Sequence, residues 1–364
     1  MITRIFISIC LLGLFVIARP AIPQKRSRGP KNIILMIGDG MGVAQVYAGL
    51  TANKGHLNLE RCTTIGFHKN QASDKYVTDS AAGATALACG QKTYNGAIAV
   101  DPGHQPLPTV LEIAERNGLS TGLVATCSIT HATPACFIAH QSSRSMDERI
   151  ASDFLKCDID LFIGGGRKFF AQRTDGLNLI DSLRSRKYQI AQTIAEVRDA
   201  KEGKLAAFLA DEQQPRYSAG RGDELNVSTE VALNILSRNK RGMFLMIEGS
   251  QIDWGGHAND TQYIIEEMID FDNAIGKVLD FAQKDGNTLV IITADHETGG
   301  FSINDGDMAT GWVDGKFTTG GHTGVMIPVY AFGPGSEKFS GIYDNTAVFH
   351  KMIEAYGFKT TDVK

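Results

Sequence analysis

Seven side chains of metal-binding types stand at separate points of the sequence, most of them after an apolar run. Four are carboxylates and three are imidazoles. Carboxylates that converge without nearby cations repel one another, and Lys and Arg are scarce in these segments. Mixed Asp and His ligands suit Zn²⁺, whereas Asp, Glu and hydroxyl oxygens suit Mg²⁺. So many ligands exceed one zinc site and predict two or three ions; the residues are Asp39, Glu248, Asp253, His257, Asp295, His296 and His322.

The spacing of two pairs indicates how they would bind an ion. Asp253 and His257 are four residues apart, so a helical turn would place both on one face. Asp295 and His296 are adjacent and need a non-helical strand end that separates their side chains. Either pair alone is more typical of a surface or capping pair. That interpretation does not explain why all of these residues stand at the ends of predicted strands.

A second candidate is Ser80, which follows Asp79 and precedes the small-residue run AAGATALACG. A hydroxyl at a helix N-terminus is either a cap or a nucleophile. No His–Asp pair stands nearby to activate Ser80, so a nucleophile here would need a metal ion. The small residues would also expose backbone N–H groups to an anion. Arg144 could grip two phosphate oxygens, unless it is a surface residue on a helix.

The elements that must position these residues alternate along the chain. Apolar runs typical of buried strands are followed by segments with the 3–4 spacing of helices. This alternation predicts an α/β fold with a largely parallel central sheet and helices on both faces. Ligands of such sheets bind beyond the carboxyl ends of the strands, where the candidate residues fall. We expect strands at 31–40, 120–126, 160–166, 205–210, 242–249, 287–296 and 327–333, helices at 108–118, 228–239 and 261–286, and a surface loop at 302–321.

The composition is ordinary for a soluble globular protein of 364 residues, with 43% hydrophobic and 21% charged residues. A net charge of −4 gives no basic footprint, so we expect no nucleic-acid partner. Residues 1–21 are typical of a secretory signal peptide, with an early Arg4 and an apolar core at 5–17. The core is short for a membrane span; the alternative is an uncleaved N-terminal anchor. We expect an exported protein, periplasmic or extracellular, with one catalytic domain over 22–364.

Export permits disulfides, but the cysteine pattern does not indicate a disulfide scaffold. Without Cys10 in the signal peptide, an odd number of cysteines remains, and no CxxC motif is present. Most are expected to be small core residues, and a single bridged pair stays open. These residues are Cys62, Cys89, Cys127, Cys136 and Cys157.

Taken together, the motifs closely resemble those of the alkaline phosphatase family. ILMIGDGMG, VTDSAAGATA, THATPA with a following AH and SR, EGSQID with a following H, TADHETGG and GGHTG appear in the family's order and spacing. The resemblance runs from about Lys31 to the last helix. It is to the compact bacterial and marine cold-type members, because the chain has no room for a large crown insertion. It implies an alkaline-phosphatase-like three-layer sandwich.

The resemblance also implies a role for each candidate. The enzyme would hydrolyse phosphate monoesters through a phosphoserine at Ser80, with Arg144 clamping the phosphate and Asp79 orienting it. The family uses two zinc ions and one magnesium ion, and an alkaline optimum follows because ligands and bound water must be deprotonated. The implied ligands are Asp39, Ser80, Asp295 and His296 for one zinc, Asp253, His257 and His322 for the other, and Asp39, Thr133 and Glu248 for magnesium.

Two positions depart from the best-known bacterial pattern. His131 stands where that pattern has Asp, which puts the identity of the third ion in question. Trp254 stands where the bacterial pattern has Lys, and the loss of that cation should weaken phosphate binding. We expect His131 and Trp254 to help line the phosphate pocket; the alternative is that Trp254 only packs. The rival function is a two-metal phosphodiesterase or sulfatase of the same superfamily, although DSAAG lacks a sulfatase modification motif. Small phosphate monoesters are the implied substrates, and a homodimer is expected, with a monomer as the alternative.

Overall fold

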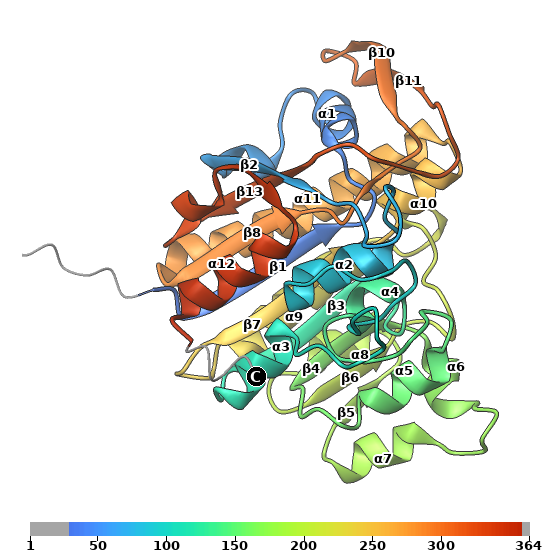
Figure 1. Ribbon diagram of the computed structural model, residues 1–364, viewed down its shortest axis with the longest axis vertical. Coiled ribbons are helices and arrows are strands. Elements are labelled where there is room, and N and C mark those ends of the chain that lie inside the picture. Colours follow the sequence, from blue (N-terminus) through green and yellow to red (C-terminus); the bar gives the residue numbers. More distant parts are fainter. Residues whose placement is uncertain (1–28, 359–364) are drawn as a thin grey trace, which may run out of the picture.

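The computed structural model describes residues 29–358, and a ten-stranded sheet runs through the middle of this part (Figure 1). Its strands are β1 (Asn32–Gly38), β2 (Thr64–Lys69), β3 (Ser120–Ser128), β4 (Leu161–Gly165), β5 (Gln189–Ala191), β6 (Leu205–Phe208), β7 (Met243–Gly249), β8 (Thr288–Thr293), β13 (Ile327–Phe332) and β14 (Gly341–Asp344). They lie in the order β14-β2-β13-β8-β1-β7-β3-β4-β6-β5. Only β13 runs antiparallel to its neighbours, which confirms the largely parallel sheet.

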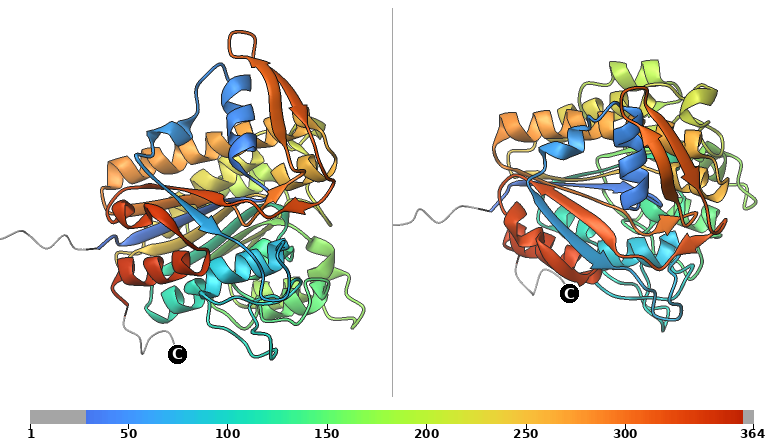
Figure 2. Two further views of the ribbon diagram at one scale, coloured as in Figure 1. Left: turned by 45° about the horizontal axis from the view of Figure 1, so that its top comes forward. Right: turned by 90° about the horizontal axis from the view of Figure 1, so that it is seen from above.

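Helices cover both faces of the sheet, as the two views of Figure 2 show, and they bury two separate cores. The helices are α1 (Val43–Ala52), α2 (Ser80–Cys89), α3 (Val110–Arg116), α4 (Ala132–Ala135), α5 (Asp147–Asp153), α6 (Arg167–Ala171), α7 (Leu179–Ser185), α8 (Ile194–Asp199), α9 (Glu224–Leu236), α10 (Ile252–His257), α11 (Thr261–Asp285) and α12 (Thr346–Tyr356). Three short 3₁₀ turns accompany them within the described residues: η1 (Asn58–Arg61), η2 (Tyr217–Ala219) and η3 (Ser336–Phe339). One core joins α2, α3 and α12 to the sheet, and the other joins α1, α9 and α11. The arrangement is the expected three-layer sandwich.

The central strands are apolar throughout because both of their faces are covered. Ile33 and Leu35 of β1 point into one core, and Ile34 and Met36 point into the other. The register sets the ends of these strands level: Ile37 is paired with Glu248 of β7 on one side and with the last residue of β8 on the other. Residues that follow the three strands therefore emerge at one edge of the sheet.

The expectation of a surface loop at 302–321 is wrong. This segment forms an antiparallel hairpin of β10 (Ser302–Asp307) and β11 (Trp312–Lys316), which lies beside α1 in Figure 1. Its residues are mostly exposed and polar, so they show no buried alternation from which strands could be predicted. A further two-stranded pairing joins β9 (Glu297–Thr298) to β12 (His322–Thr323) and brings together two motifs that are far apart in the sequence.

The five cysteines between Cys62 and Cys157 are all free, and four of them are buried, as expected of small core residues. Across residues 29–358, no helix has both the length and the apolar character that crossing a membrane requires. The expected signal peptide, at 1–21, lies outside the described residues.

Candidate active site

The first cluster of candidate ligands lies where β1 and β8 end. Asp39 follows β1 directly, Asp295 and His296 come just after β8, and all three are fully buried. Nε2 of His296 is 3.4 Å from Oδ1 of Asp39 and 3.2 Å from Oδ2 of Asp295. Neither oxygen of Asp39, nor Oδ2 of Asp295, has a hydrogen-bond partner among the described residues. Buried oxygens without partners are costly, so these three point to an ion.

The electrostatics of this cluster point the same way. Burial raises the pKa of Asp39 well above its usual value, and the neighbouring carboxylates raise it further. Burial and the charge of Asp253 raise the pKa of Asp295 to about 6, while burial lowers the pKa of His296 well below its usual value. The chain by itself therefore disfavours the charged carboxylates. A bound cation reverses this preference, because its own charge dominates the site.

The second cluster joins α10 to β12. Nε2 of His257 is 3.4 Å from Asp253, Nε2 of His322 is 3.5 Å from Asp253, and the two Nε2 atoms are 3.2 Å apart. Nδ1 of His257 lies 2.7 Å from the carbonyl of Gly320, and Nδ1 of His322 lies 2.9 Å from the carbonyl of Thr78. Since a carbonyl only accepts, each neutral ring carries its proton on Nδ1. Two Nε2 lone pairs thus face each other beside a carboxylate, as metal ligands do.

The predicted helical turn at Asp253–His257 is confirmed, and its two glycines allow close packing against neighbouring segments. A Cβ at Gly256 would lie 2.7 Å from the carbonyl oxygen of Thr298, and one at Gly255 would lie 2.7 Å from the backbone N of Ile264. Both distances are too short for any side chain. Glycine at these positions therefore lets α10 lie against β9 and α11.

A third cluster surrounds Glu248 at the end of β7. Its Oε1 is buried without a hydrogen-bond partner, and so is Oγ1 of Thr133 on α4. The sulfur of Cys127, near the end of β3, lies 3.5 Å from Oε2 of Glu248 and 3.3 Å from the carbonyl oxygen of Ser128, and either oxygen can accept the thiol hydrogen. The Cys127 sulfur, a ring nitrogen of His131 and a Glu248 oxygen all lie within 4.8 Å of one another. Burial raises the pKa of Glu248 to about 8.

Ser80 is the first residue of α2, but the residue that caps this helix is Asp79. Oδ1 of Asp79 accepts a hydrogen bond from the backbone N of Ala82 at 2.9 Å. The hydroxyl of Ser80 instead lies 3.2 Å from Nε2 of His296, at the first cluster. The Ser80 hydroxyl is therefore not the cap of this helix, and its role as a nucleophile stays a prediction.

Arg144 contacts both Asp79, the neighbour of Ser80, and His131 of the third cluster. It lies in the turn before α5, and not on a helix surface. Its Nη1 donates to Oδ2 of Asp79 at 3.0 Å, and its Nη2 donates to Nε2 of His131 at 3.1 Å. Trp254 of α10 stands edge-to-face to the His131 ring, with centroids 6.3 Å apart. Every predicted site residue thus belongs to one connected region at the edge of the sheet.

Two residues of this region were missed or misread from the sequence. Thr298 donates its hydroxyl hydrogen to Asp253, and the same oxygen lies 3.2 Å from Nδ1 of His296, so it links two clusters. It belongs to the motif TADHETGG, where its position two residues after His296 is the only signal. Cys127 is buried in the core, as expected, but its closeness to Glu248 was missed; the one signal in the sequence is His131, which stands four residues after it.

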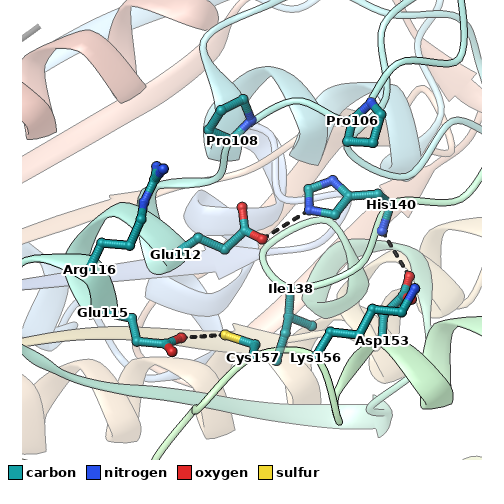
Figure 3. Close-up of a pocket in the computed structure, with 10 residues that line it drawn as sticks. All are labelled: Pro106, Pro108, Glu112, Glu115, Arg116, Ile138, His140, Asp153, Lys156 and Cys157. Carbon is teal, nitrogen blue, oxygen red and sulfur yellow. Dashed lines mark hydrogen bonds and ion pairs between the residues drawn. The ribbon is translucent and has the colours of Figure 1, made fainter. Parts of the chain in front are cut away.

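A separate cavity of about 340 Å³ lies between α3 and the segment 153–157 (Figure 3). Its lining includes the ion pair of Glu112 with His140, at 3.0 Å, and Cys157, which donates to Glu115. None of the candidate ligands lines it. Figure 3 shows three carboxylates in this lining, Glu112, Glu115 and Asp153, and each is already paired with a side chain of this chain, Asp153 with Lys156 at 2.6 Å.

Comparison with known proteins supports the interpretation that the geometry favours. The family model described as alkaline phosphatase matches residues 30–316. Alkaline phosphatase 3 of Bacillus subtilis is 36% identical over 91% of this chain and 90% of its own length. Alkaline phosphatase of Escherichia coli is 31% identical over 90% and 86%. The chain belongs to the alkaline phosphatase family.

Solved alkaline phosphatases agree with the fold over nearly the whole chain. The enzyme from the Antarctic bacterium TAB5 has a TM-score of 0.86 and 44% identity, covering 92% of this chain and 99% of that one. A variant of that enzyme, in which a histidine is replaced by aspartate, has magnesium bound in a site called M3. Membership makes this chain a hydrolase of phosphate monoesters, and its three ligand clusters make metal binding the expected basis of that activity.

Proposed function

We propose that this alkaline phosphatase cleaves phosphate monoesters through a phosphoserine on Ser80. The observation that carries the proposal is that the Ser80 hydroxyl does not cap α2. Asp79 caps the helix, and the hydroxyl lies beside His296 at the first ligand cluster. The ligand sets proposed for two zinc ions are Asp39, Ser80, Asp295 and His296 for one and Asp253, His257 and His322 for the other. A third divalent cation, which the resemblance gives as magnesium, would be held by Asp39, Thr133 and Glu248.

The residues present fit these ions. Buried oxygens of Asp39, Thr133, Glu248 and Asp295 have no hydrogen-bond partner among the described residues, and they belong to the proposed ligand sets. Asp39 has two such oxygens, as a residue that bridges two ions requires. When bound, the cations would lower the pKa of the serine hydroxyl and neutralise charge on the phosphate and on the leaving alkoxide.

The remaining steps belong to side chains of the chain. Arg144 presents two N–H groups, which now contact Asp79 and His131, and these can grip two oxygens of a phosphate. The Ser80 oxygen attacks phosphorus, and the bond from phosphorus to the alcohol oxygen breaks. Water then attacks the phosphoserine, which releases inorganic phosphate and restores the Ser80 hydroxyl. The backbone N–H groups at the start of α2 favour the added negative charge.

The test compares three substrates with and without chelator: p-nitrophenyl phosphate, its bis-ester and p-nitrophenyl sulfate. We expect monoester hydrolysis that is lost on chelation, and lost in Ser80→Ala while the variant keeps its zinc. Thr229→Ser, which removes a buried methyl group from α9, a helix that carries none of the proposed ligands, is the control and should stay active. Turnover of the diester or sulfate above that of the monoester would establish the rival function instead.

We further propose that the chain is exported after cleavage of a signal peptide at residues 1–21, leaving a single catalytic domain, and that it works as a homodimer in the periplasm or outside the cell. The support is the charge and apolar pattern of the N-terminus and the resemblance to the family. N-terminal sequencing of protein secreted from cells tests the cleavage, and light scattering of the purified protein tests the dimer. An N-terminus that still begins at Met1 would refute the first, and a monomeric mass would refute the second.

A further inference from the structure

The pocket around Glu248 contains donors that an oxygen-only magnesium site does not need. The Cys127 sulfur, a ring nitrogen of His131 and a Glu248 oxygen converge within 4.8 Å. Cys127 and Glu248 are fully buried. The carboxylate also keeps one buried oxygen without a hydrogen-bond partner, and the Thr133 hydroxyl does the same beside it. The thiol is therefore not a lone cysteine, because unpaired buried ligand atoms share its pocket.

The chemistry of these donors decides which ion they favour. Magnesium prefers six oxygens in an octahedron and keeps several waters, whereas thiolate and imidazole select zinc and its neighbours in the transition series. The Cys127 sulfur lies 3.3 Å from the carbonyl oxygen of Ser128 and 3.5 Å from Oε2 of Glu248, and its single hydrogen can be donated to either. A cation bound to the sulfur would release this proton to solvent. One thiolate and one carboxylate would then balance the two positive charges of the ion.

His131 can join such a site in only one tautomer. Its Nε2 now accepts from Arg144, which can only donate, so the proton of the neutral ring is on Nδ1, and that atom is buried without a partner. An ion bound at Nδ1 would move the proton to Nε2. Two donors would then face each other, and the Arg144 Nη2 group would be released. Arg144 needs that group to hold a phosphate, so occupation of the third site would prepare the phosphate clamp.

We propose that the third ion of this enzyme is a thiophilic cation such as Zn²⁺, in preference to magnesium, and that Cys127 and His131 join Glu248 as its ligands in place of the all-oxygen set given above. The inference deepens the proposed function, on which it rests for the two other zinc sites. It concerns the choice of the third ion alone, so metal content can test it separately from the reaction.

Cobalt provides a direct test, because a cysteine sulfur bound to Co²⁺ gives a charge-transfer band in the near ultraviolet. The full-length mature protein is stripped with chelator, reloaded with Co²⁺ and compared with Cys127→Ser and Cys89→Ser. Cys89 is the matched control, a buried free thiol at the far end of α2 whose hydrogen bond is to the carbonyl of Leu107. We expect the band in the wild type and in Cys89→Ser, and its loss in Cys127→Ser.

A second measurement needs no variant and so does not depend on the folding of one. The stripped wild type is dialysed against Zn²⁺ with a large excess of Mg²⁺, and its metals are counted. We expect three zinc ions per chain, with zinc X-ray absorption that includes a sulfur neighbour at about 2.3 Å. Two zinc ions and one magnesium ion without a sulfur neighbour would overturn the inference and leave the proposed function standing. Failure to retain any zinc would overturn both.

Discussion

Thr298→Val tests whether the hydroxyl of Thr298 holds two metal clusters in their binding geometry. Its single hydrogen is donated to Asp253, so its oxygen accepts the Nδ1 hydrogen of His296, 3.2 Å away. That bond keeps the proton of the ring on Nδ1 and leaves the Nε2 lone pair facing Asp39, Asp295 and Ser80. Valine fills nearly the same volume but makes neither hydrogen bond, so packing is preserved while the orientation of both ligands is lost.

The expected loss of zinc affinity in Thr298→Val follows from the role of Thr298 in orienting two ligands. Removing a side chain that orients a metal ligand costs about 10–100-fold in metal affinity or activity. This corresponds to about 1.4–2.8 kcal/mol of binding free energy. Because the substitution removes no ligand, we expect the zinc dependence of activity to shift to higher concentration by this factor. Activity at saturating zinc should recover to within a few-fold of the wild type.

The assay measures p-nitrophenyl phosphate hydrolysis against buffered free zinc, together with zinc competition against a chromophoric chelator. Thr229→Val is the matched control, since Thr229 of α9 is as buried as Thr298 and its hydroxyl has no hydrogen-bond partner among the described residues. It should leave the zinc dependence unchanged. A Thr298→Val enzyme with the zinc midpoint of the wild type, within twofold, would refute the reasoning that this hydroxyl orients the ligands.

Three further predictions follow from the site and its surroundings. Trp254→Lys should tighten competitive inhibition by inorganic phosphate several-fold by adding a cation beside the pocket; Trp312→Lys at the exposed hairpin is the control, and unchanged inhibition in Trp254→Lys would count against the proposed role. The metal-free protein should lose thermal stability as the pH rises from about 4 to 8. Burial raises the pKa of Asp295 from 3.8 to about 6 and that of Glu248 from 4.5 to about 8, so between each pair of values the unfolded chain gives up a proton that the folded protein keeps, and folding becomes less favourable until the folded pKa is passed. Calorimetry with chelator present measures this, and a midpoint that rises over that range would contradict it. The Glu112–His140 pair should stabilise the fold by about 1 kcal/mol near pH 6. Burial raises the pKa of Glu112, but the hydrogen bond from His140 outweighs it, so the pKa of Glu112 is lowered overall. Burial lowers the pKa of His140, but the hydrogen bond to Glu112 outweighs it, so the pKa of His140 is raised overall. This contribution is complete between the ordinary values of 4.5 and 6.5 and is lost as the pH rises through the folded pKa of His140; a double-mutant cycle with Glu112→Gln and His140→Gln at pH 6 and pH 9 would contradict it by giving equal coupling.

The identity of most ligands could be predicted because strand ends are visible in a sequence. Asp39 and Asp295 each follow a run of buried apolar residues, and parallel strands deliver such positions to one edge of the sheet. The spacing of Asp253 and His257 likewise required only a helical turn, which α10 provides. Local patterns of this kind depend on residues close together in the chain, so the sequence by itself determined the fold class and the candidate ligands at the strand ends. Their division among separate ions was implied by the family resemblance and stays a proposal.

Relations between distant segments were decided by the tertiary structure. The pairing of β9 with β12 brings His322 beside His257, and no local pattern indicates that contact. The antiparallel direction of β13 leaves no pattern in its own residues. The hairpin at 302–316 is exposed and shows no alternation of buried side chains, so neither feature could be predicted from the sequence. The packing of β3 against β7 turned Cys127 from an ordinary buried thiol into a neighbour of Glu248. Burial and hydrogen bonding across the fold decided these features, and both depend on which side chains meet only after the chain has folded.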